Sequence, residues 1–507
     1  MKTVSIDGDD LTLEQTEEVA LGKASVKIHP KAIRKINKCR KYVEKIVDTG
    51  KTVYGINTGF GKLCRERISK KDIEKLQENL ILSHALSVGP VFCEEEVRAV
   101  MLLRANVLAK GYSGVRLELV QTLVDMMNKG VHPMIPEKGS VGASGDLAPL
   151  AFVALVMMGK GWAFYKGKLM EGKKALKNAG IRPLRFYAKE GLALINGTCV
   201  MTALGVLSLL KAERLAELAD KAGALSLEAA LCTPVAFDEN IQKVRKYKGQ
   251  RQSARNLINL TRQSQIREFH KACPKVQDPY SFRCMPQVHG AVRDVLSYVR
   301  SVLDVEINSA TDNPLIFPNE DKVISGGNFH GEPVALALDF LGIAASELAS
   351  ISERRIAALM NPEISDLPPF LTKDPGLNSG YMMAHTVAAS LVSENKSLSH
   401  PASVDSIPTS NNQEDHVSMG TIAARKTREI INNTEEVLAI EFLAASQGID
   451  FRAPLKPGIG TGEIYTQIRK AIPSVTKDRL LVGDLVKMKD LMRRQFSVGS
   501  KTGVTRW

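Results

Sequence analysis

Three long segments in the middle of the chain repeat apolar residues at alternating spacings of three and four, the pattern of a helix with one buried face. The first apolar stripe consists of Leu215, Leu218, Ala222, Leu225 and Ala229. It lies in a stretch from about Met201 to Cys232 that contains no proline. At 1.5 Å per residue, this stretch predicts a helix roughly 45 Å long.

Two further stripes follow the first one along the chain. The second consists of Val288, Val292, Val295, Val299 and Val302. Although β-branched residues are typical of strands, a repeat of about 3.5 residues favours a helix. The third stripe begins directly after Pro333, which suits a first helical turn, and consists of Val334, Leu338, Leu341, Ala345 and Leu348. Because striped helices bury their faces best on one another, we predict a mainly α fold with a long-helix bundle core.

Glycine- and proline-marked loops separate the predicted helices, at residues 54–61, 139–149, 325–333 and 408–420. Loops carry function more often than helices do, so we expect glycine-rich active-site loops. We predict a single unit over residues 1–507, with an N-terminal part over roughly 1–195 and a long-helix core with the C-terminal part over roughly 196–507. Several stripes are long enough to extend beyond the core of one subunit, which predicts a homo-oligomer.

The composition is that of an ordinary globular protein, with 507 residues, 44% hydrophobic, 24% charged and 5% aromatic. The first 22 residues are acidic and lack a secretory signal pattern, and no stretch reaches the roughly 18 uninterrupted apolar residues of a membrane helix. Seven cysteines form no CxxC pair, and nine histidines form no HExxH motif. We therefore expect a cytoplasmic protein with reduced thiols, no membrane segment and no metal.

The formal net charge is +13, and much of it is concentrated between Gln242 and Lys275, where ten lysines and arginines face the single acid Glu268. A nucleic-acid partner is one interpretation of such a segment. Aromatic side chains that could stack on bases are nearly absent from it, with only Tyr247 and Phe269. We interpret the segment as a solvated surface, and a basic helical nucleic-acid-binding protein is the alternative from a different functional class.

Residues 139–150 bring small side chains together in one turn before an apolar segment. Such a turn is ordinarily a helix cap. Gly145 has no side chain, however, so its backbone nitrogen can approach the carbonyl carbon of Ala143 and close a five-membered ring. Loss of two waters, one from that carbonyl and one from the Ser144 hydroxyl, would leave an imidazolone with an exocyclic methylidene. This group is a carbon electrophile, which no unmodified side chain supplies.

The same stretch resembles the prosthetic-group signature of the aromatic amino-acid ammonia-lyases, and further motifs between Tyr54 and Glu414 extend the resemblance over nearly the whole chain. In that family, Ala-Ser-Gly matures into 4-methylidene-imidazole-5-one. The resemblance therefore implies that Ala143, Ser144 and Gly145 form this group. It also implies a homotetramer whose active sites are shared between subunits.

Four motifs resemble the catalytic loops of the family. Tyr54, in the loop over residues 54–61, would lie on a mobile lid and act as acid or base. Asn196 would contact the prosthetic group and, with Tyr280, stabilise the amine adduct through hydrogen bonds, and Phe329 would lie beside the ring. Tyr280, in the segment over residues 277–283, would face the electrophile.

The resemblance also implies a set of substrate contacts. Arg283 would bind the substrate carboxylate, because its planar guanidinium donates two parallel hydrogen bonds. Gln277 and Asn313 would add polar contacts. Ser83 and His84 match the pair that histidine-specific members carry, whereas phenylalanine-specific members tend to carry Phe-Leu.

The expected reaction is the non-oxidative deamination of L-histidine to trans-urocanate and ammonia, the first step of histidine degradation. Glu414 would meet the substrate imidazole, because a carboxylate favours the protonated ring. We interpret Tyr54 as the base, although the roles of Tyr54 and Glu414 could be reversed. A tyrosine or phenylalanine ammonia-lyase, or a 2,3-aminomutase with the same prosthetic group, is the nearest alternative, and Ser83, His84 and Glu414 argue against it.

Two segments depart from the family pattern. Members commonly read Arg-x-His-Pro-Gly-Gln where this chain has Arg-Lys-Tyr-Lys-Gly-Gln at residues 245–250, and Ser87 replaces a common glycine. Both lie outside the residues assigned to chemistry. The first makes the basic segment more basic, which leaves a surface partner there open.

Overall fold

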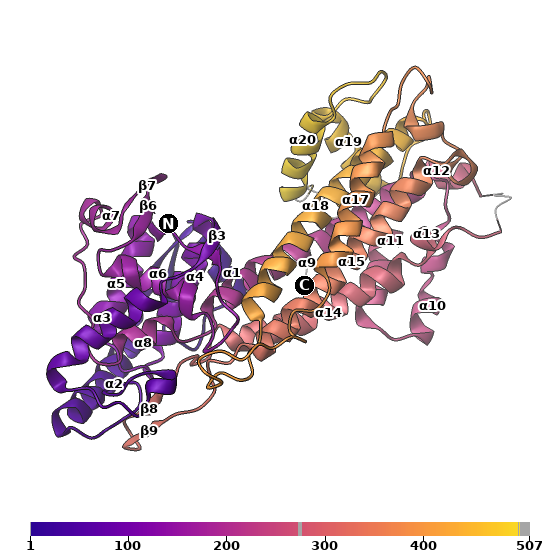
Figure 1. Ribbon diagram of the computed structural model, residues 1–507. Helices are drawn as coiled ribbons and strands as arrows, with labels where there is room; N and C mark the ends of the chain where they lie inside the picture. The colour runs from indigo at the N-terminus through magenta and orange to yellow at the C-terminus, as the bar shows by residue number, and fades with distance from the viewer. Residues whose placement is uncertain (1, 272–275, 495, 497–507) are drawn as a thin grey trace. The chain divides into compact units, whose positions relative to one another are not determined.

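The computed structural model describes residues 2–271, 276–494 and 496 and is mainly helical (Figure 1), which confirms the predicted fold class. Contacts divide the chain into two compact units. Unit 1 comprises Met1–Leu210, Val299–Asp339 and Pro401–Arg425, and unit 2 comprises Lys211–Tyr298, Phe340–His400 and Lys426–Trp507. The sequence-based division near residue 195 stays a prediction.

Four long helices dominate the chain. Three of them, α9 (Cys199–Ala229), α14 (Met285–Glu306) and α15 (Glu332–Leu359), lie where the apolar stripes predict them. The fourth, α18 (Gly420–Asp450), was not predicted from a stripe. The division between the two units falls inside each of these four helices.

The apolar stripes of α9 and α15 are buried throughout, as predicted. In α14 the buried row is Val292, Leu296, Val299 and Leu303, whereas the other three predicted valines are only half-buried. Two adjacent rows of α14 are apolar, and the row that contains the leucines faces the core. The sequence therefore predicts this helix correctly but places its buried face about one row away.

Unit 1 combines short helices with four small sheets. Its remaining helices are α1 (Leu13–Ala20), α2 (Pro30–Thr49), α3 (Ile73–His84), α4 (Glu94–Ala109), α5 (Leu117–Lys129), α6 (Leu147–Met157), α7 (Gly172–Asn178) and α8 (Glu190–Ile195). Its strands are β1 (Lys2–Ile6), β2 (Ala24–Ile28), β3 (Val88–Val91), β4 (Val131–Pro133), β5 (Pro136–Lys138), β6 (Trp162–Tyr165), β7 (Lys168–Glu171), β8 (Leu315–Phe317) and β9 (Lys322–Ile324). Strands of three to five residues are too short to give a periodic signal in the sequence.

The four sheets have simple topologies. Strands β1 and β2 pair in parallel, with Val4 opposite Val26. Strands β3 and β5 pair antiparallel, β4-β6-β7 form a three-stranded antiparallel sheet, and β8 pairs antiparallel with β9. Helix α4 forms the core of this unit and is almost entirely buried, and α6 packs on α8. Helix α6 begins just after Gly145 and α8 ends just before Asn196, so this packing brings two predicted site residues close together.

Unit 2 is a helical bundle. Figure 1 shows α15, α17 (Met382–Leu398) and α18 side by side in it. The other helices of unit 2 are α10 (Glu239–Val244), α11 (Lys248–Leu260), α12 (Gln265–Phe269), α13 (Tyr280–Arg283), α16 (Pro362–Ser365), α19 (Ile459–Ala471) and α20 (Val482–Arg493). Small residues allow the long helices to approach closely, since a Cβ at Gly223 of α9 would lie 2.4 Å from the sulfur of Met285 of α14.

Helix α15 is long and apolar enough to cross a membrane, with a mean hydropathy of 1.7 over its most apolar window. The protein itself buries 67% of that window. Because buried core helices pass the same test, length and composition are weak evidence for a membrane span.

The basic segment of residues 242–275 spans α10, α11 and α12, and Cys273 and Lys275 lie outside the described residues. Six other cysteines are present as thiols. The interpretation of the basic segment as a solvated surface stays a prediction.

Candidate active site

Unit 1 contains a cavity of about 600 Å³ to which several separate loops contribute. It brings together seven of the residues selected from the sequence, namely Tyr54, Ala143, Ser144, Asn196, Asn313, Phe329 and Glu414. These residues are far apart in the chain, so their convergence is a property of the fold. All residues that line this cavity belong to unit 1.

The Ala143-Ser144-Gly145 turn is strained and tightly packed. Ser144 has φ of 51° and Gly145 has φ of 76°, both in the left-handed region that side chains disfavour. A Cβ at Gly145 would lie 2.2 Å from the carbonyl oxygen of Gly197. The backbone nitrogen of Gly197 donates to the carbonyl of Ser144 at 3.2 Å. Only glycine fits at position 145, as the predicted ring chemistry requires.

Asp146 directly follows the turn and fixes its position. Its buried carboxylate accepts hydrogen bonds from the backbone nitrogens of Val200 (2.8 Å) and Met201 (3.0 Å) and from the hydroxyl of Thr421 (2.5 Å). Burial raises the pKa of Asp146 to about 6, against the opposing effect of these hydrogen bonds. The turn is therefore tied to the first residues of both α9 and α18.

Glu414 faces the turn across the cavity. The hydroxyl of Ser144 donates to its Oε1 at 3.4 Å. The hydroxyls of Thr409 (2.8 Å) and Ser410 (2.7 Å) donate to its other oxygen, Oε2. The carboxylate is thus held by one oxygen while the other points to the residue from which the electrophile would form.

Tyr54 begins the loop of residues 54–61 and lines the cavity. Its hydroxyl oxygen accepts a hydrogen bond from the backbone nitrogen of Gly61 at 3.2 Å. Burial raises the pKa of the Tyr54 phenol, and the negative charge of Glu414 acts in the same direction. These effects favour the protonated phenol.

Ser83 and His84 end helix α3 and are not part of the cavity lining within the described chain. The Nδ1 of His84 contacts the carbonyl of Leu80 at 2.9 Å and the Ser83 hydroxyl at 3.0 Å. Burial lowers the pKa of His84, while the charge of Glu414 acts to raise it.

Three predicted residues, Gln277, Tyr280 and Arg283, belong to unit 2. The side chain of Tyr280 is exposed, and the Arg283 guanidinium lies 4.4 Å from the centre of its ring. Within the described residues, the structure does not place these three side chains in the lining of the unit 1 cavity. The predicted roles of these three residues stay predictions.

Other residues line the cavity without having been selected from the sequence. His330 and His416 stack at 5.8 Å between ring centres, and Cys64 also lines the cavity. His330 directly follows Phe329, and His416 lies two residues after Glu414. Proximity in the sequence to a predicted site residue could therefore have identified both histidines. Cys64 has no comparable signal in the sequence.

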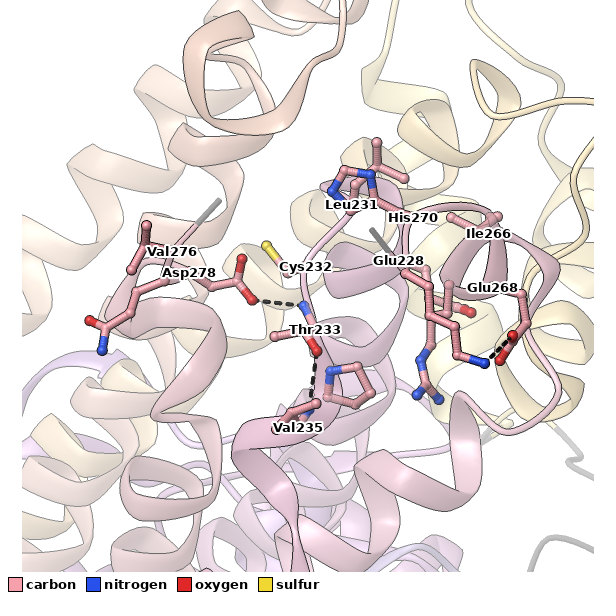
Figure 2. Close-up of a pocket in the computed structure, with 14 residues that line it drawn as sticks. Glu228, Leu231, Cys232, Thr233, Val235, Ile266, Glu268, His270, Val276 and Asp278 are labelled. Carbon is pink, nitrogen blue, oxygen red and sulfur yellow. Dashed lines mark hydrogen bonds and ion pairs between the residues drawn. The ribbon is translucent and has the colours of Figure 1, made fainter. Parts of the chain in front are cut away.

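A second cavity, of about 350 Å³, lies in unit 2 beside helix α12. Figure 2 shows the carboxylate of Asp278 accepting a hydrogen bond from the backbone nitrogen of Thr233, at 2.7 Å. The buried Glu228 lines this cavity, and burial raises its pKa to about 7. Gln277 is part of the same lining. This cavity lacks a strained turn of small residues, and the sequence motifs do not converge on it.

A family model described as Aromatic amino acid lyase matches residues 11–470. The chain belongs to the aromatic amino acid lyase family. Two relatives of this lyase named histidine ammonia-lyase, from Caldanaerobacter subterraneus subsp. tengcongensis and Alkaliphilus metalliredigens, are 57% and 56% identical to it. Each match covers 97% of both chains.

Solved structures place the lyase in the same fold. The crystal structure of histidine ammonia-lyase from Trypanosoma cruzi matches with a TM-score of 0.91 and 43% identity, covering 99% of this chain and 97% of that one. The tyrosine aminomutase from Streptomyces globisporus matches with a TM-score of 0.91 and 38% identity, covering 97% of each chain. The fold is therefore common to members that carry different names, and specificity has to be argued from the site.

Proposed function

We infer that this lyase converts L-histidine to trans-urocanate and ammonia by non-oxidative deamination, the first step of histidine degradation. The observation that carries this conclusion is the cavity in which the Ala143-Ser144-Gly145 turn faces the Glu414 carboxylate, with 3.4 Å between Ser144 Oγ and Glu414 Oε1. The names of the relatives that are 56% and 57% identical over nearly the whole chain support the same activity.

We propose that Ala143, Ser144 and Gly145 form 4-methylidene-imidazole-5-one, and the residues present fit this group. Gly145 cannot carry a side chain, and Ser144 lines the cavity in a strained conformation. Asn196 Oδ1 is buried at the cavity without a hydrogen-bond partner in the described part of the chain, so a polar acceptor is available there. When formed, the group supplies an electrophilic carbon that makes the substrate amine a better leaving group.

We propose Tyr54 as the base that removes the β-proton and Glu414 as the partner of the substrate imidazole. The carboxylate of Glu414 suits an imidazole N–H, because it accepts a hydrogen bond and favours the protonated ring. Burial raises the pKa of Tyr54 and so favours its protonated form. Positive charge on a bound substrate would lower that pKa and prepare the phenol to act as a base.

We propose that Gln277, Tyr280 and Arg283 reach the cavity of a second copy in a homotetramer. Two observations support this arrangement: the cavity lining comes from unit 1 alone, and unit 2 exposes large apolar side chains. The exposed large apolar residues of unit 2 on α14, α15 and α17 are Tyr298, Phe340, Ile343, Met382, Met383 and Val387. Apolar surface of this kind is typical of contacts between subunits. Arg283 would then bind the substrate carboxylate, and Tyr280 would stabilise the reacting amine by a hydrogen bond.

Two further proposals concern the setting of the enzyme. We propose that it acts in the cytoplasm, in keeping with six cysteines present as thiols. We also propose that L-histidine rather than nucleic acid is its partner and that no metal is needed. The family membership accounts for the small-residue turn, which a nucleic-acid-binding function would leave unexplained.

The rival activities share the fold, as the match to a tyrosine aminomutase illustrates. The test is to supply purified enzyme with L-histidine, L-tyrosine or L-phenylalanine in parallel and to follow the ultraviolet absorbance of the conjugated acrylate. Urocanate from L-histidine alone is the expected result. A conjugated acrylate from L-tyrosine or L-phenylalanine would overturn the assignment, and so would the appearance of a β-amino acid.

A further inference from the structure

A fully buried ion pair lies behind Asn196, outside the set of residues assigned to chemistry. The ammonium of Lys189 lies 3.0 Å and 2.8 Å from the two carboxylate oxygens of Asp312, and both side chains are 0% exposed. Lys189 precedes helix α8 and has φ of 74°, a left-handed conformation that a lysine adopts only when its surroundings hold it there. Asn196 is at the opposite end of the same helix.

The ion pair determines which way the Asn196 amide points. Its Nδ2 donates to Asp312 Oδ1 at 3.3 Å and to the carbonyl of Asn313 at 3.0 Å. Both neighbours are acceptors, so the amide nitrogen must face them and the amide oxygen must face the other way. That oxygen is buried and, among the described residues, has no hydrogen-bond partner, while Asn196 itself lines the cavity. Because Asn196 lines the cavity, this oxygen is the acceptor that its side chain can present to a ligand there.

We propose that Lys189 and Asp312 are positioning residues that hold the Asn196 amide oxygen toward the cavity as the acceptor for the substrate amine. The inference rests on the deamination proposed above. The amine is the substrate donor left for this oxygen, because the substrate carboxylate offers only acceptors and the imidazole N–H is assigned above to Glu414. An unpartnered buried amide oxygen is costly, and a ligand that donates to it recovers that free energy.

The lysine is essential to this arrangement. Without its ammonium, Asp312 would be a buried carboxylate lacking an opposite charge, and burial would favour its protonated form. A protonated carboxyl can donate a hydrogen bond, and the Asn196 amide could then rotate and turn its nitrogen to the cavity. The pair thus sets the hydrogen-bonding polarity of the cavity wall as well as the local fold.

The decisive experiment is a double-mutant cycle between Asp312 and Asn196. Asp312→Asn should lower kcat for L-histidine by about 10- to 100-fold, the range typical of residues that orient a functional side chain. In an Asn196→Ala background, where there is no amide to orient, the same change should alter kcat less than about twofold. Equal effects in both backgrounds would overturn the inference, because Asp312 would then act independently of Asn196.

A binding measurement complements the rates. In the Ser144→Ala background, which cannot form the prosthetic group, calorimetry with L-histidine should show weaker binding after Asp312→Asn, and intact mass should show that Asp312→Asn alone still loses two waters. An unchanged affinity for L-histidine would overturn the inference. An Asp312→Asn chain that has not lost two waters would also overturn it, because Asp312 would then act in formation of the prosthetic group.

Two variants control for folding. Glu190→Gln removes a neighbouring buried carboxylate that pairs with Arg116, and it should lower thermal stability while kcat stays within about twofold. If Asp312→Asn does not fold, the neutral pair Lys189→Met with Asp312→Leu takes its place in the cycle, since buried pairs are often replaceable by apolar side chains. Wild-type enzyme that makes no urocanate would refute the proposed function, whereas active wild type with an additive cycle refutes only the positioning role.

Discussion

The two units each contain a buried charge network, and the networks differ in what they leave unsatisfied. In unit 2, the Asp220 carboxylate accepts hydrogen bonds from Ser253, Asn256, His289 and Arg293. In the same unit, Glu441 accepts hydrogen bonds from Ser226, Ser352 and Arg355. In unit 1, the network that begins at Lys189 ends at the Asn196 oxygen, which has no partner in the described part of the chain.

This difference separates a structural network from a functional one. Burial alone would raise the pKa of Asp220, but the Arg293 charge and the hydrogen bonds from His289 and Ser253 hold it well below its ordinary value. Such a carboxylate has its bonding capacity filled and joins α9, α11 and α14 in the bundle. The Asn196 oxygen, in contrast, keeps its capacity for a ligand. An unsatisfied group beside a cavity therefore indicates function better than burial or charge does.

The largest effect is expected at the turn in unit 1. Ser144→Ala removes the hydroxyl whose loss would create the methylidene, so kcat should fall by about 10³-fold or more. Urocanate formation measures the rate, and intact mass should show a chain that has not lost two waters. The free energy of unfolding should change by less than about 1 kcal/mol, because one half-buried hydroxyl with a single long hydrogen bond is lost from a cavity wall. Wild-type rates in this variant would refute the prosthetic-group proposal.

The opposite result is expected for the network in unit 2. Asp220→Asn leaves the buried Arg293 guanidinium without its anionic partner, which should lower the free energy of unfolding by about 3–5 kcal/mol. Urea unfolding at fixed protein concentration measures this loss. The kcat of the remaining folded enzyme should stay within about twofold. A large drop in kcat at unchanged stability would contradict the comparison between the two units.

The long helices could be predicted from sequence because their period extends over many residues. Helices α9 and α15 have the predicted buried stripes, and Pro333 does lie in the first turn of α15. The short strands and the buried row of α14 could not be predicted, because local pattern does not say which of two apolar rows faces the core. Which row of α14 is buried depends on the elements that pack against it.

The site residues could be predicted only where a motif carries them. Tyr54, Ser144 and Glu414 were selected by resemblance, and the fold brings them into one cavity. Lys189 was missed because a single lysine before a short helix has no sequence signature. Asp312 was missed although it directly precedes Asn313, because its role depends on the Lys189 ammonium, which is 123 positions away in the chain.

A pH-dependent effect on stability is expected from Glu228 at the second cavity. Glu228 lines the second cavity (Figure 2). Burial raises the pKa of Glu228 to about 7, so ionisation of its carboxyl group opposes folding. Below its ordinary pKa of 4.5, both the folded and unfolded states are protonated and the group has no effect. As the pH rises from about 4.5 to 7, the unfolded state ionises first, and stability should fall by about 3 kcal/mol.

Glu228→Gln tests this pH dependence. The variant cannot ionise, so its free energy of unfolding should lack that fall, and above pH 7 the difference between the two proteins should be constant. Urea unfolding at a series of pH values measures both curves. Parallel curves for wild type and variant would show that Glu228 does not titrate in this range.

A smaller effect on activity is expected from Arg283→Lys, although Arg283 belongs to unit 2. A lysine keeps the charge but loses the planar pair of donors that fits a carboxylate, so KM for L-histidine should rise about tenfold with a smaller change in kcat. Steady-state kinetics measures the two constants separately. Unchanged kinetics would remove Arg283 from the site.

Mixing two inactive chains tests whether the contrast between the units belongs to one chain or to the assembly. If unit 2 of one copy completes the cavity of another, co-expressed Ser144→Ala and Arg283→Ala chains should form some sites with both native residues. Random pairing predicts recovery of about one quarter of wild-type activity, because each site draws both residues independently. If each site used residues of a single chain, every site would carry one defect and no activity would return. Recovery would thus mean that Arg283 of one copy completes the cavity that contains Ser144 of another copy.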